Sequence, residues 1–186
     1  MKIFSMSLLI GLTSLVFPQE IDLEKFSELG KPGEMHRILN ALSGTWDVKA
    51  IYKIGSGPEM EGTAICEAKW MLDGRILSKE YKSTMMGQPF TVQQYLGYDN
   101  FRQKFFEIQF GSDTTSYLHN IGTISEDKKT ITLIGDSLDP FTLKPAKLRV
   151  VYILESAEKY TMEWHMPNAE GKEEKMVTLI HTKKKT

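Results

Sequence analysis

The sequence has 186 residues, with 23 Lys and Arg against 24 Asp and Glu, so its formal net charge at neutral pH is −1. This length fits one domain, and a charge so near zero argues against a dedicated nucleic-acid binder, which carries a basic excess. Hydrophobic residues make up 41% of the chain, enough for a packed core. The single cysteine, Cys66, excludes an internal disulfide and a metal site built from several cysteines.

The N-terminus has the pattern of a secretory signal peptide. Lys2 precedes a short, uncharged and mostly apolar run over residues 3–17, Pro18 ends the run, and charged residues follow from Glu20. The run is shorter than the ~20 apolar residues that a transmembrane helix needs; a buried N-terminal helix or a membrane anchor is the alternative. We therefore expect residues 1–19 to be removed and the mature protein to be exported, to the periplasm or out of the cell, with no stable membrane anchor.

Residues 20–42 form an N-terminal segment in which apolar residues recur at spacings of three to five. Pro32-Gly33 interrupts this pattern, so the sequence predicts a loose first part and then a short helix from about Glu34 to Leu42. Ser43-Gly44 ends the helix, because glycine is a common helix terminator.

From residue 43 to 183, apolar and polar residues alternate, as in strands with one buried face. Short turns separate the segments, and Asp73-Gly74 predicts a two-residue hairpin between the second and third. Parallel strands would need crossover helices, and no helical pattern lies between the segments. We predict an all-β fold, an antiparallel up-and-down lipocalin-like barrel of about ten strands with a short N-terminal helix; a two-sheet sandwich is the alternative. The expected strands cover residues 45–54, 61–72, 75–86, 90–98, 104–110, 114–124, 130–135, 147–155, 160–166 and 174–182.

A set of short motifs follows in a fixed order along this region. Before them, Gly44-Thr45-Trp46 looks like the Gly-x-Trp opening of lipocalin-like barrels. The motifs of the set are Trp70-Met71-Leu72-Asp73-Gly74-Arg75, Lys79-Glu80-Tyr81, Met85-Met86-Gly87-Gln88-Pro89-Phe90, Leu96-Gly97-Tyr98-Asp99-Asn100 and Asp139-Pro140. Together they resemble the bacterial domain-of-unknown-function family 1579, over residues 36–183. The resemblance implies a lipocalin-like, calycin-type barrel and no established activity. The sequence departs from the family pattern at Ile108-Gln109-Phe110-Gly111, where a Trp-containing segment is expected.

A small antiparallel barrel either fills its interior with side chains or leaves room for one ligand. Small residues such as Ala64, facing large ones, and deformable methionines favour a cavity. We therefore expect a small apolar or amphipathic ligand as the partner. The alternative is a packed structural or interaction protein in which the same side chains form a solid core. The side chains expected to bind the ligand are Tyr52, Trp70, Tyr81, Phe106, Ile108, Met162 and Trp164.

The sequence predicts no catalytic residue, no cofactor and no metal site. It contains no Gly-x-Ser-x-Gly, phosphate-loop or dinucleotide-binding motif, and Cys66 alternates with alanines as a buried thiol would. One alternative is a small enzyme in which an inward Glu80, Glu163 or His165 acts as acid or base. The other is a haem or metal binder, with His181 as the candidate ligand because it shares a strand face with apolar residues.

Overall fold

The computed structural model describes residues 22–53, 57–85, 87–139, 142–168 and 170–185. The signal peptide predicted for residues 1–19 lies outside these ranges. Within them, no helix combines the length and the apolar character that a membrane span requires.

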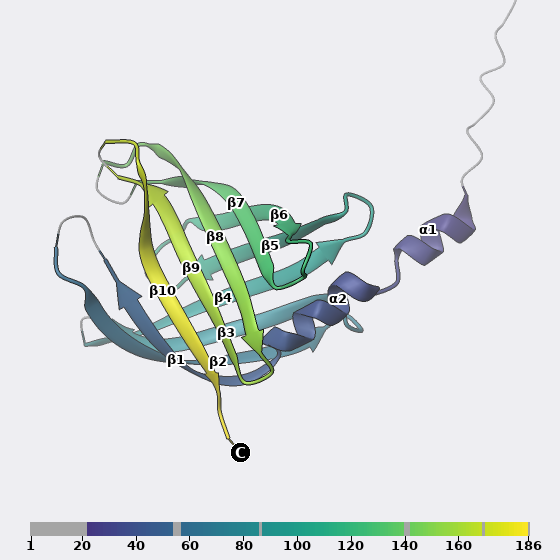
Figure 1. The fold of residues 1–186 in the computed structure, drawn as a ribbon, viewed down its shortest axis with the longest axis horizontal. Coiled ribbons are helices and arrows are strands. Elements are labelled where there is room, and N and C mark those ends of the chain that lie inside the picture. Colours follow the sequence, from purple (N-terminus) through teal and green to yellow (C-terminus); the bar gives the residue numbers. More distant parts are fainter. Residues whose placement is uncertain (1–21, 54–56, 86, 140–141, 169, 186) are drawn as a thin grey trace, which may run out of the picture.

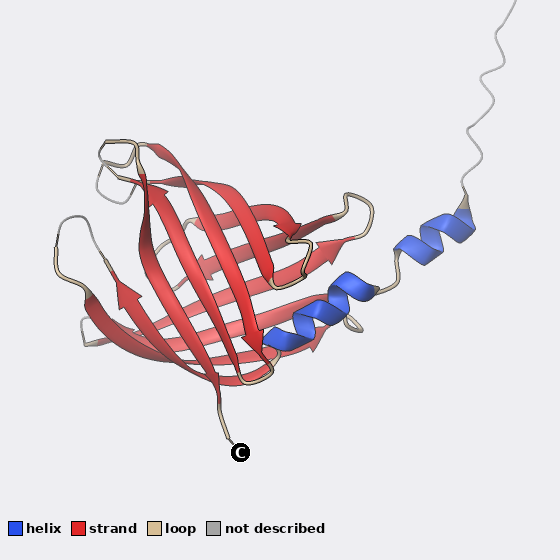
Figure 2. Cartoon of the chain, in the orientation of Figure 1, coloured by secondary structure: helices blue, strands red, loops and turns tan. Residues whose placement is uncertain are grey.

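Strands make up most of the described chain, and each lies within a few residues of its predicted segment (Figure 2). The gap between the strands expected over residues 130–135 and 147–155 is shorter in the structure, because the first of these strands extends to Leu138 and the second begins at Pro145. The strands are β1 (Gly44–Tyr52), β2 (Met60–Met71), β3 (Ile76–Met85), β4 (Gln88–Asp99), β5 (Lys104–Gly111), β6 (Tyr117–Ile124), β7 (Thr130–Leu138), β8 (Pro145–Ser156), β9 (Lys159–Pro167) and β10 (Glu173–Lys183).

The strands close into one antiparallel barrel (Figure 1). Each strand pairs with its neighbours in sequence, and β1 also pairs with β10, from Trp46 beside Lys183 to Tyr52 beside Val177. Closure leaves no unpaired sheet edge, which protects a meander of this size from edge-to-edge aggregation. The predicted lipocalin-like barrel is confirmed, and the described strands do not divide into the two sheets of a sandwich.

The turn between β2 and β3 is longer than the two-residue hairpin predicted from Asp73-Gly74. It covers residues 72–75, and Leu72, Asp73 and Gly74 have φ values of 50°, 53° and 81°. The carbonyl of Met71 accepts hydrogen bonds from the N–H groups of Gly74 and Arg75. The turn is therefore in the predicted place, but the chain reverses over four residues, and three of them lie in the left-handed region that glycine adopts at least cost.

Two helices precede the barrel: α1 (Leu23–Leu29) and α2 (Glu34–Ile38), the latter continued by a 3₁₀ turn, η1 (Leu39–Leu42). The helix predicted from Glu34 to Leu42 is confirmed as α2 and η1 together. The prediction of a loose segment before it is wrong, since α1 lies there. The Asp22 side chain caps α1 by accepting a hydrogen bond from the backbone N–H of Lys25 at 2.9 Å. No residue of α1 is buried, so this helix packs into no core.

The turn η1 and the start of β1 close one end of the barrel. Leu39, Leu42 and Trp46 have no exposed surface, and the indole Nε1 of Trp46 donates a hydrogen bond to the Leu42 carbonyl at 3.0 Å. The Trp46 ring meets Tyr160 edge-on, with 4.8 Å between ring centres, and Lys183 Nζ lies 4.4 Å from the Trp46 ring centre. The Gly-Thr-Trp motif thus builds the closed end, away from the turns that join β1 to β2, β3 to β4 and β5 to β6.

Candidate functional site

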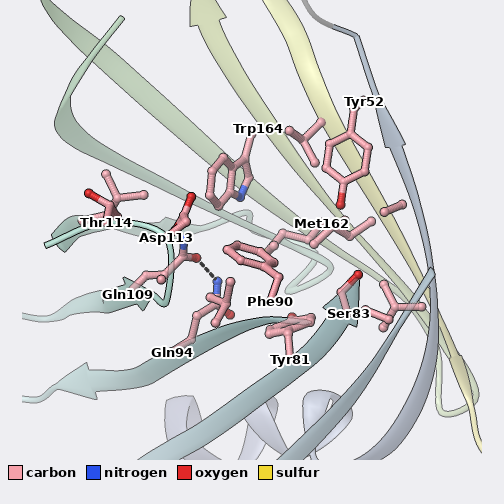
Figure 3. Close-up of a pocket in the computed structure, with 18 of the residues that line it drawn as sticks. Tyr52, Tyr81, Ser83, Phe90, Gln94, Gln109, Asp113, Thr114, Met162 and Trp164 are labelled. Carbon is pink, nitrogen blue, oxygen red and sulfur yellow. Dashed lines mark hydrogen bonds between the residues drawn. The ribbon is translucent and has the colours of Figure 1, made fainter. Parts of the chain in front are cut away.

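A cavity of about 330 Å³ occupies the half of the barrel away from η1. This volume lies at the lower end of the ~300–1,000 Å³ typical of small-molecule sites. Ala50 and Ala64 leave room on the β1–β2 side, and Figure 3 shows Trp164, Phe90 and Met162 extending into the same space. Most of the wall is apolar; its aliphatic members include Val48, Ala50, Ala64, Val92, Leu118, Val177 and Leu179.

The mouth of the cavity lies at the connection between β5 and β6. Asp113, Thr114 and Ser116 line the cavity there and are exposed to solvent. Tyr117, at the start of β6, is 64% exposed although it also lines the cavity. A molecule can therefore reach the cavity from solvent past these polar side chains.

The deep end of the cavity is polar. Gln94 and Gln109 are direct neighbours on β4 and β5, and Gln94 Nε2 donates a hydrogen bond to Gln109 Oε1 at 2.5 Å (Figure 3). Beside them, Tyr81 forms part of the wall. In the described part of the chain, two buried wall atoms, Oε1 of Gln94 and Nε1 of Trp164, have no hydrogen-bond partner. The cavity is thus amphipathic, with apolar sides and hydrogen-bonding groups at depth.

Beneath this polar end lies a fully buried lysine. Lys79 precedes Tyr81 by two residues on β3 and has no exposed surface. Its Nζ has no hydrogen-bond partner among the described residues and lies 5.1, 4.8 and 5.3 Å from the ring centres of Tyr81, Tyr152 and Tyr160. Burial lowers the pKa of this amine. The three ring faces replace part of the stabilisation that water would give an ammonium.

A buried carboxyl shares this layer. Glu107 has no exposed surface; its Oε1 accepts a hydrogen bond from Asn120 Nδ2 at 3.0 Å, and its Oε2 accepts one from the Tyr152 hydroxyl. Burial raises the pKa of Glu107, while the bond from Tyr152 and the charge of Lys79 oppose the rise. The layer therefore holds an acid and a base that are both shifted towards their neutral forms.

His181 belongs to the same buried layer. Its ring stacks on Tyr160, with 3.8 Å between ring centres. Nδ1 lies 3.2 Å from the Leu179 carbonyl, which can only accept, so Nδ1 carries the proton and Nε2 accepts from the Tyr81 hydroxyl at 3.0 Å. Burial holds the pKa of His181 well below its usual range. Because both nitrogens are engaged and the ring is not in the cavity wall, His181 does not fit the role of a haem ligand.

The sequence-predicted ligand-binding residues divide into three groups. Tyr52, Tyr81, Met162 and Trp164 line the cavity. Trp70 faces inward at the closed end, where its Nε1 donates a hydrogen bond to Asn40 Oδ1 at 2.7 Å. The remaining two, Phe106 and Ile108, lie on the outer face of β5 and do not line the cavity.

The orientation predicted for β5 is therefore wrong by one residue. Its inward, buried side chains are Phe105, Glu107 and Gln109, whereas Phe106 and Ile108 alternate with them on the outside. Glu107 and Gln109 tolerate the interior because each has a hydrogen-bond partner on a neighbouring strand.

The residues considered for acid–base chemistry also lie on the outer face. Glu80 pairs with Lys82 at 2.7 Å on the outside of β3. Glu163 pairs with Lys175 at 2.8 Å and with His165 at 3.0 Å on the outside of β9. None of these side chains reaches the cavity. Across the described ranges, no group of three or more His, Cys, Asp or Glu side chains is placed to hold a metal ion.

Lys79, Gln94, Glu107 and Gln109 are the residues that sequence reasoning missed. Each occupies an inward position of a strand. For Lys79 the sequence does contain a clue, because Lys79 lies two residues from both Leu77 and Tyr81 and therefore on the same face of the strand. A polar residue in an inward position interrupts the alternation of apolar and polar residues. Sequence alone does not show the hydrogen-bond partners on other strands that allow it to be buried.

Comparisons with known proteins agree with this fold. The family model described as "Protein of unknown function (DUF1579)" matches residues 31–183, and no curated protein matches the chain. The crystal structure of Rv2717c from M. tuberculosis is 15% identical, with a TM-score of 0.61 over 83% of this chain and 100% of that one. A redesigned β-barrel, b11L5F_LGL, is 13% identical, with a TM-score of 0.44 over 82% of this chain and 100% of that one. The likeness to Rv2717c concerns the fold alone.

Proposed function

We propose that this chain, which belongs to the DUF1579 family of proteins of unknown function, is an exported barrel that holds one small apolar or amphipathic molecule. The match confirms the resemblance noted in its motifs, but the description of the family establishes no activity. The observation that carries the proposal is the cavity of about 330 Å³, with apolar walls and a mouth at the β5–β6 connection. Removing an apolar molecule from water into such a site is favourable.

The distribution of polarity supports a ligand with two unlike ends. Val48, Val177 and Leu179 belong to the apolar wall, whereas Gln94 and Gln109 lie at depth. Buried polar side chains cost free energy in a site that needs only hydrocarbon packing. A wholly hydrocarbon ligand would leave the polar end unmatched, so the arrangement favours an amphipathic one.

A change at Ala64 tests the cavity directly. We expect Ala64→Phe to weaken binding of the apolar fluorescent probe N-phenylnaphthylamine by at least about tenfold, because the added ring occupies the cavity beside β2. Probe fluorescence titration gives the Kd, and a thermal melt first establishes that the variant folds. The matched control is Thr63→Phe, the preceding residue on β2, which is exposed on the outer face. Equal affinity in both variants and the wild type would contradict the proposal.

Export has its own support and its own test. The charge of Lys2, the apolar run over residues 3–17 and the break at Pro18 together support a signal peptide. When the full chain is expressed in a bacterium, we expect intact-mass measurement of the protein to give an N-terminus near residues 19–21. Full-length chain confined to the cytosolic fraction would refute export without affecting the ligand proposal.

A further inference from the structure

Two unpaired atoms of the cavity wall are of opposite kinds. Nε1 of Trp164 and Oε1 of Gln94 are buried, line the same cavity and lack a hydrogen-bond partner in the described part of the chain. Figure 3 shows both side chains extending from the wall into the cavity. An indole N–H can only donate, and an amide oxygen can only accept. Since buried polar atoms are nearly always paired in folded proteins, these two atoms indicate what a ligand must supply.

Neighbouring polar groups are already engaged. The amide nitrogen of Gln94 donates to Gln109 at 2.5 Å, the Tyr81 hydroxyl donates to His181 at 3.0 Å, and the Ser83 hydroxyl donates to the Thr63 carbonyl at 2.7 Å. Among the buried atoms of the described wall residues, the indole N–H of Trp164 and the amide oxygen of Gln94 are the ones left without a partner.

The charges around the cavity exclude an anionic head group at depth. Among the described lining residues, the one charged side chain is Asp113, which is exposed at the mouth. Lys79 is not part of the wall, and its amine lies among three tyrosine rings beneath it. A carboxylate entering the cavity would lose its water without gaining a cation, which is costly.

We propose that the ligand is an uncharged alcohol, whose hydroxyl accepts a hydrogen bond from Trp164 Nε1 and donates one to Gln94 Oε1. This inference rests on the proposed function, because it assigns the polar end of the molecule held in that cavity. A hydroxyl group both donates and accepts. An ether oxygen accepts only and leaves Gln94 unpaired, and an ionised carboxylate cannot donate. The hydrocarbon part of the alcohol lies against the aliphatic wall.

The test compares three ligands with the same hydrocarbon chain. Decanol, decyl methyl ether and decanoate compete with bound N-phenylnaphthylamine at neutral pH. We expect decanol to displace the probe at concentrations roughly 3- to 10-fold lower than the ether, because the ether leaves a buried acceptor unpaired. Decanoate should compete more weakly than either.

Two variants assign this preference to the two atoms. Trp164→Phe keeps an aromatic ring but removes the donor, so it should weaken both decanol and the ether by roughly 3- to 10-fold. Gln94→Met combined with Gln109→Met removes the open acceptor of Gln94 together with the acceptor of Gln109, which the single change would leave unpaired, so in this double variant decanol and the ether should compete equally. The matched control is Gln93→Met, which changes the neighbouring glutamine on the outer face of β4 and should keep the preference for decanol. The ratio between two ligands does not depend on small losses of stability.

The possible failures are distinguishable. If N-phenylnaphthylamine does not bind the wild type, the proposed function itself fails. If the probe binds but decanol has no advantage over the ether, or if the double variant with methionine at positions 94 and 109 keeps that advantage, the alcohol assignment is overturned while the cavity keeps its function. If decanoate competes best and Lys79→Met removes its advantage, the ligand is an anion anchored by the buried amine and the assignment is also overturned.

Discussion

Trp46→Ala is expected to lower the free energy of unfolding by about 3–5 kcal/mol, the usual cost of truncating a fully buried tryptophan. Trp46 has no exposed surface. Its indole donates a hydrogen bond to the Leu42 carbonyl, meets the Tyr160 ring edge-on and lies beneath the Lys183 amine. Alanine would open a cavity at the closed end and leave that carbonyl unpaired. Urea denaturation measures the loss as a shift of the midpoint at an unchanged m-value.

Trp70→Ala is the matched control for this experiment. Trp70 lies at the same end of the barrel but is half-buried, and its Nε1 bonds to the side chain of Asn40. Trp70 buries less apolar surface on folding than Trp46 does. Trp70→Ala should therefore lower the free energy of unfolding by less than half as much as Trp46→Ala. Equal costs would show that Trp46 does not hold the closed end together in the way described.

The strand order and the closure of the barrel could be predicted because they follow from local signals. Apolar residues at every second position indicate a strand with one apolar and one polar face. The turns between the strands are too short for the crossovers that parallel pairing needs, so the strands must pair antiparallel. The closing pair, β1 with β10, follows from the cost of two free edges. The helix α1 escaped prediction because Pro32-Gly33 interrupts the apolar recurrence of residues 20–42, so the sequence predicts a loose part before the interruption although that part is helical.

The faces of β5 could not be predicted from the sequence alone. Period-two reasoning assigns the apolar side chains Phe106 and Ile108 to the interior, but Glu107 and Gln109 occupy it. On the outside, Phe106 covers Gly97 of β4, where a Cβ would lie 2.6 Å from its ring. The rule fails because the barrel interior contains a polar layer, in which side-chain hydrogen bonds take the place of apolar contacts.

That polar layer depends on contacts that sequence spacing does not reveal. Tyr81 and His181 are 100 residues apart but share a hydrogen bond. Glu107 and Tyr152 lie on β5 and β8 and also meet inside the barrel. The candidate site could be predicted only where a wall residue is aromatic or apolar, as with Tyr52, Met162 and Trp164. The groups that give the cavity its specificity become visible only when the strands close.

Replacing Lys79 with methionine is expected to raise the free energy of unfolding at neutral pH by about 1–3 kcal/mol. The amine is buried without a hydrogen-bond partner among the described residues, and methionine is an unbranched, apolar side chain that can fill the same space among the tyrosine rings. Glu107 keeps its bonds from Asn120 and Tyr152. Lys82→Met, an exposed change on the outer face of the same strand, should alter stability by no more than about 0.5 kcal/mol.

The pH dependence of stability identifies the amine as the cause. Burial lowers the folded-state pKa of Lys79 below the ordinary value of 10.5. Between that lowered pKa and 10.5, the unfolded chain binds a proton that the folded chain does not, so stability rises with pH across this window. Below the window, the full cost of burying the ammonium is present. The advantage of Lys79→Met should therefore be largest at low pH and shrink as the pH approaches 10.5, as denaturant titrations at several pH values would measure.

A methionine variant that is less stable than the wild type at neutral pH would reverse this interpretation. It would mean that the ammonium stabilises the fold as the counter-charge of an ionised Glu107. In that case Glu107→Gln, which removes the negative charge and keeps a hydrogen-bond acceptor, should restore stability to the Lys79→Met background. If burial of the amine alone is the cost, Glu107→Gln should change the wild type and the Lys79→Met variant by the same amount, since independent effects add.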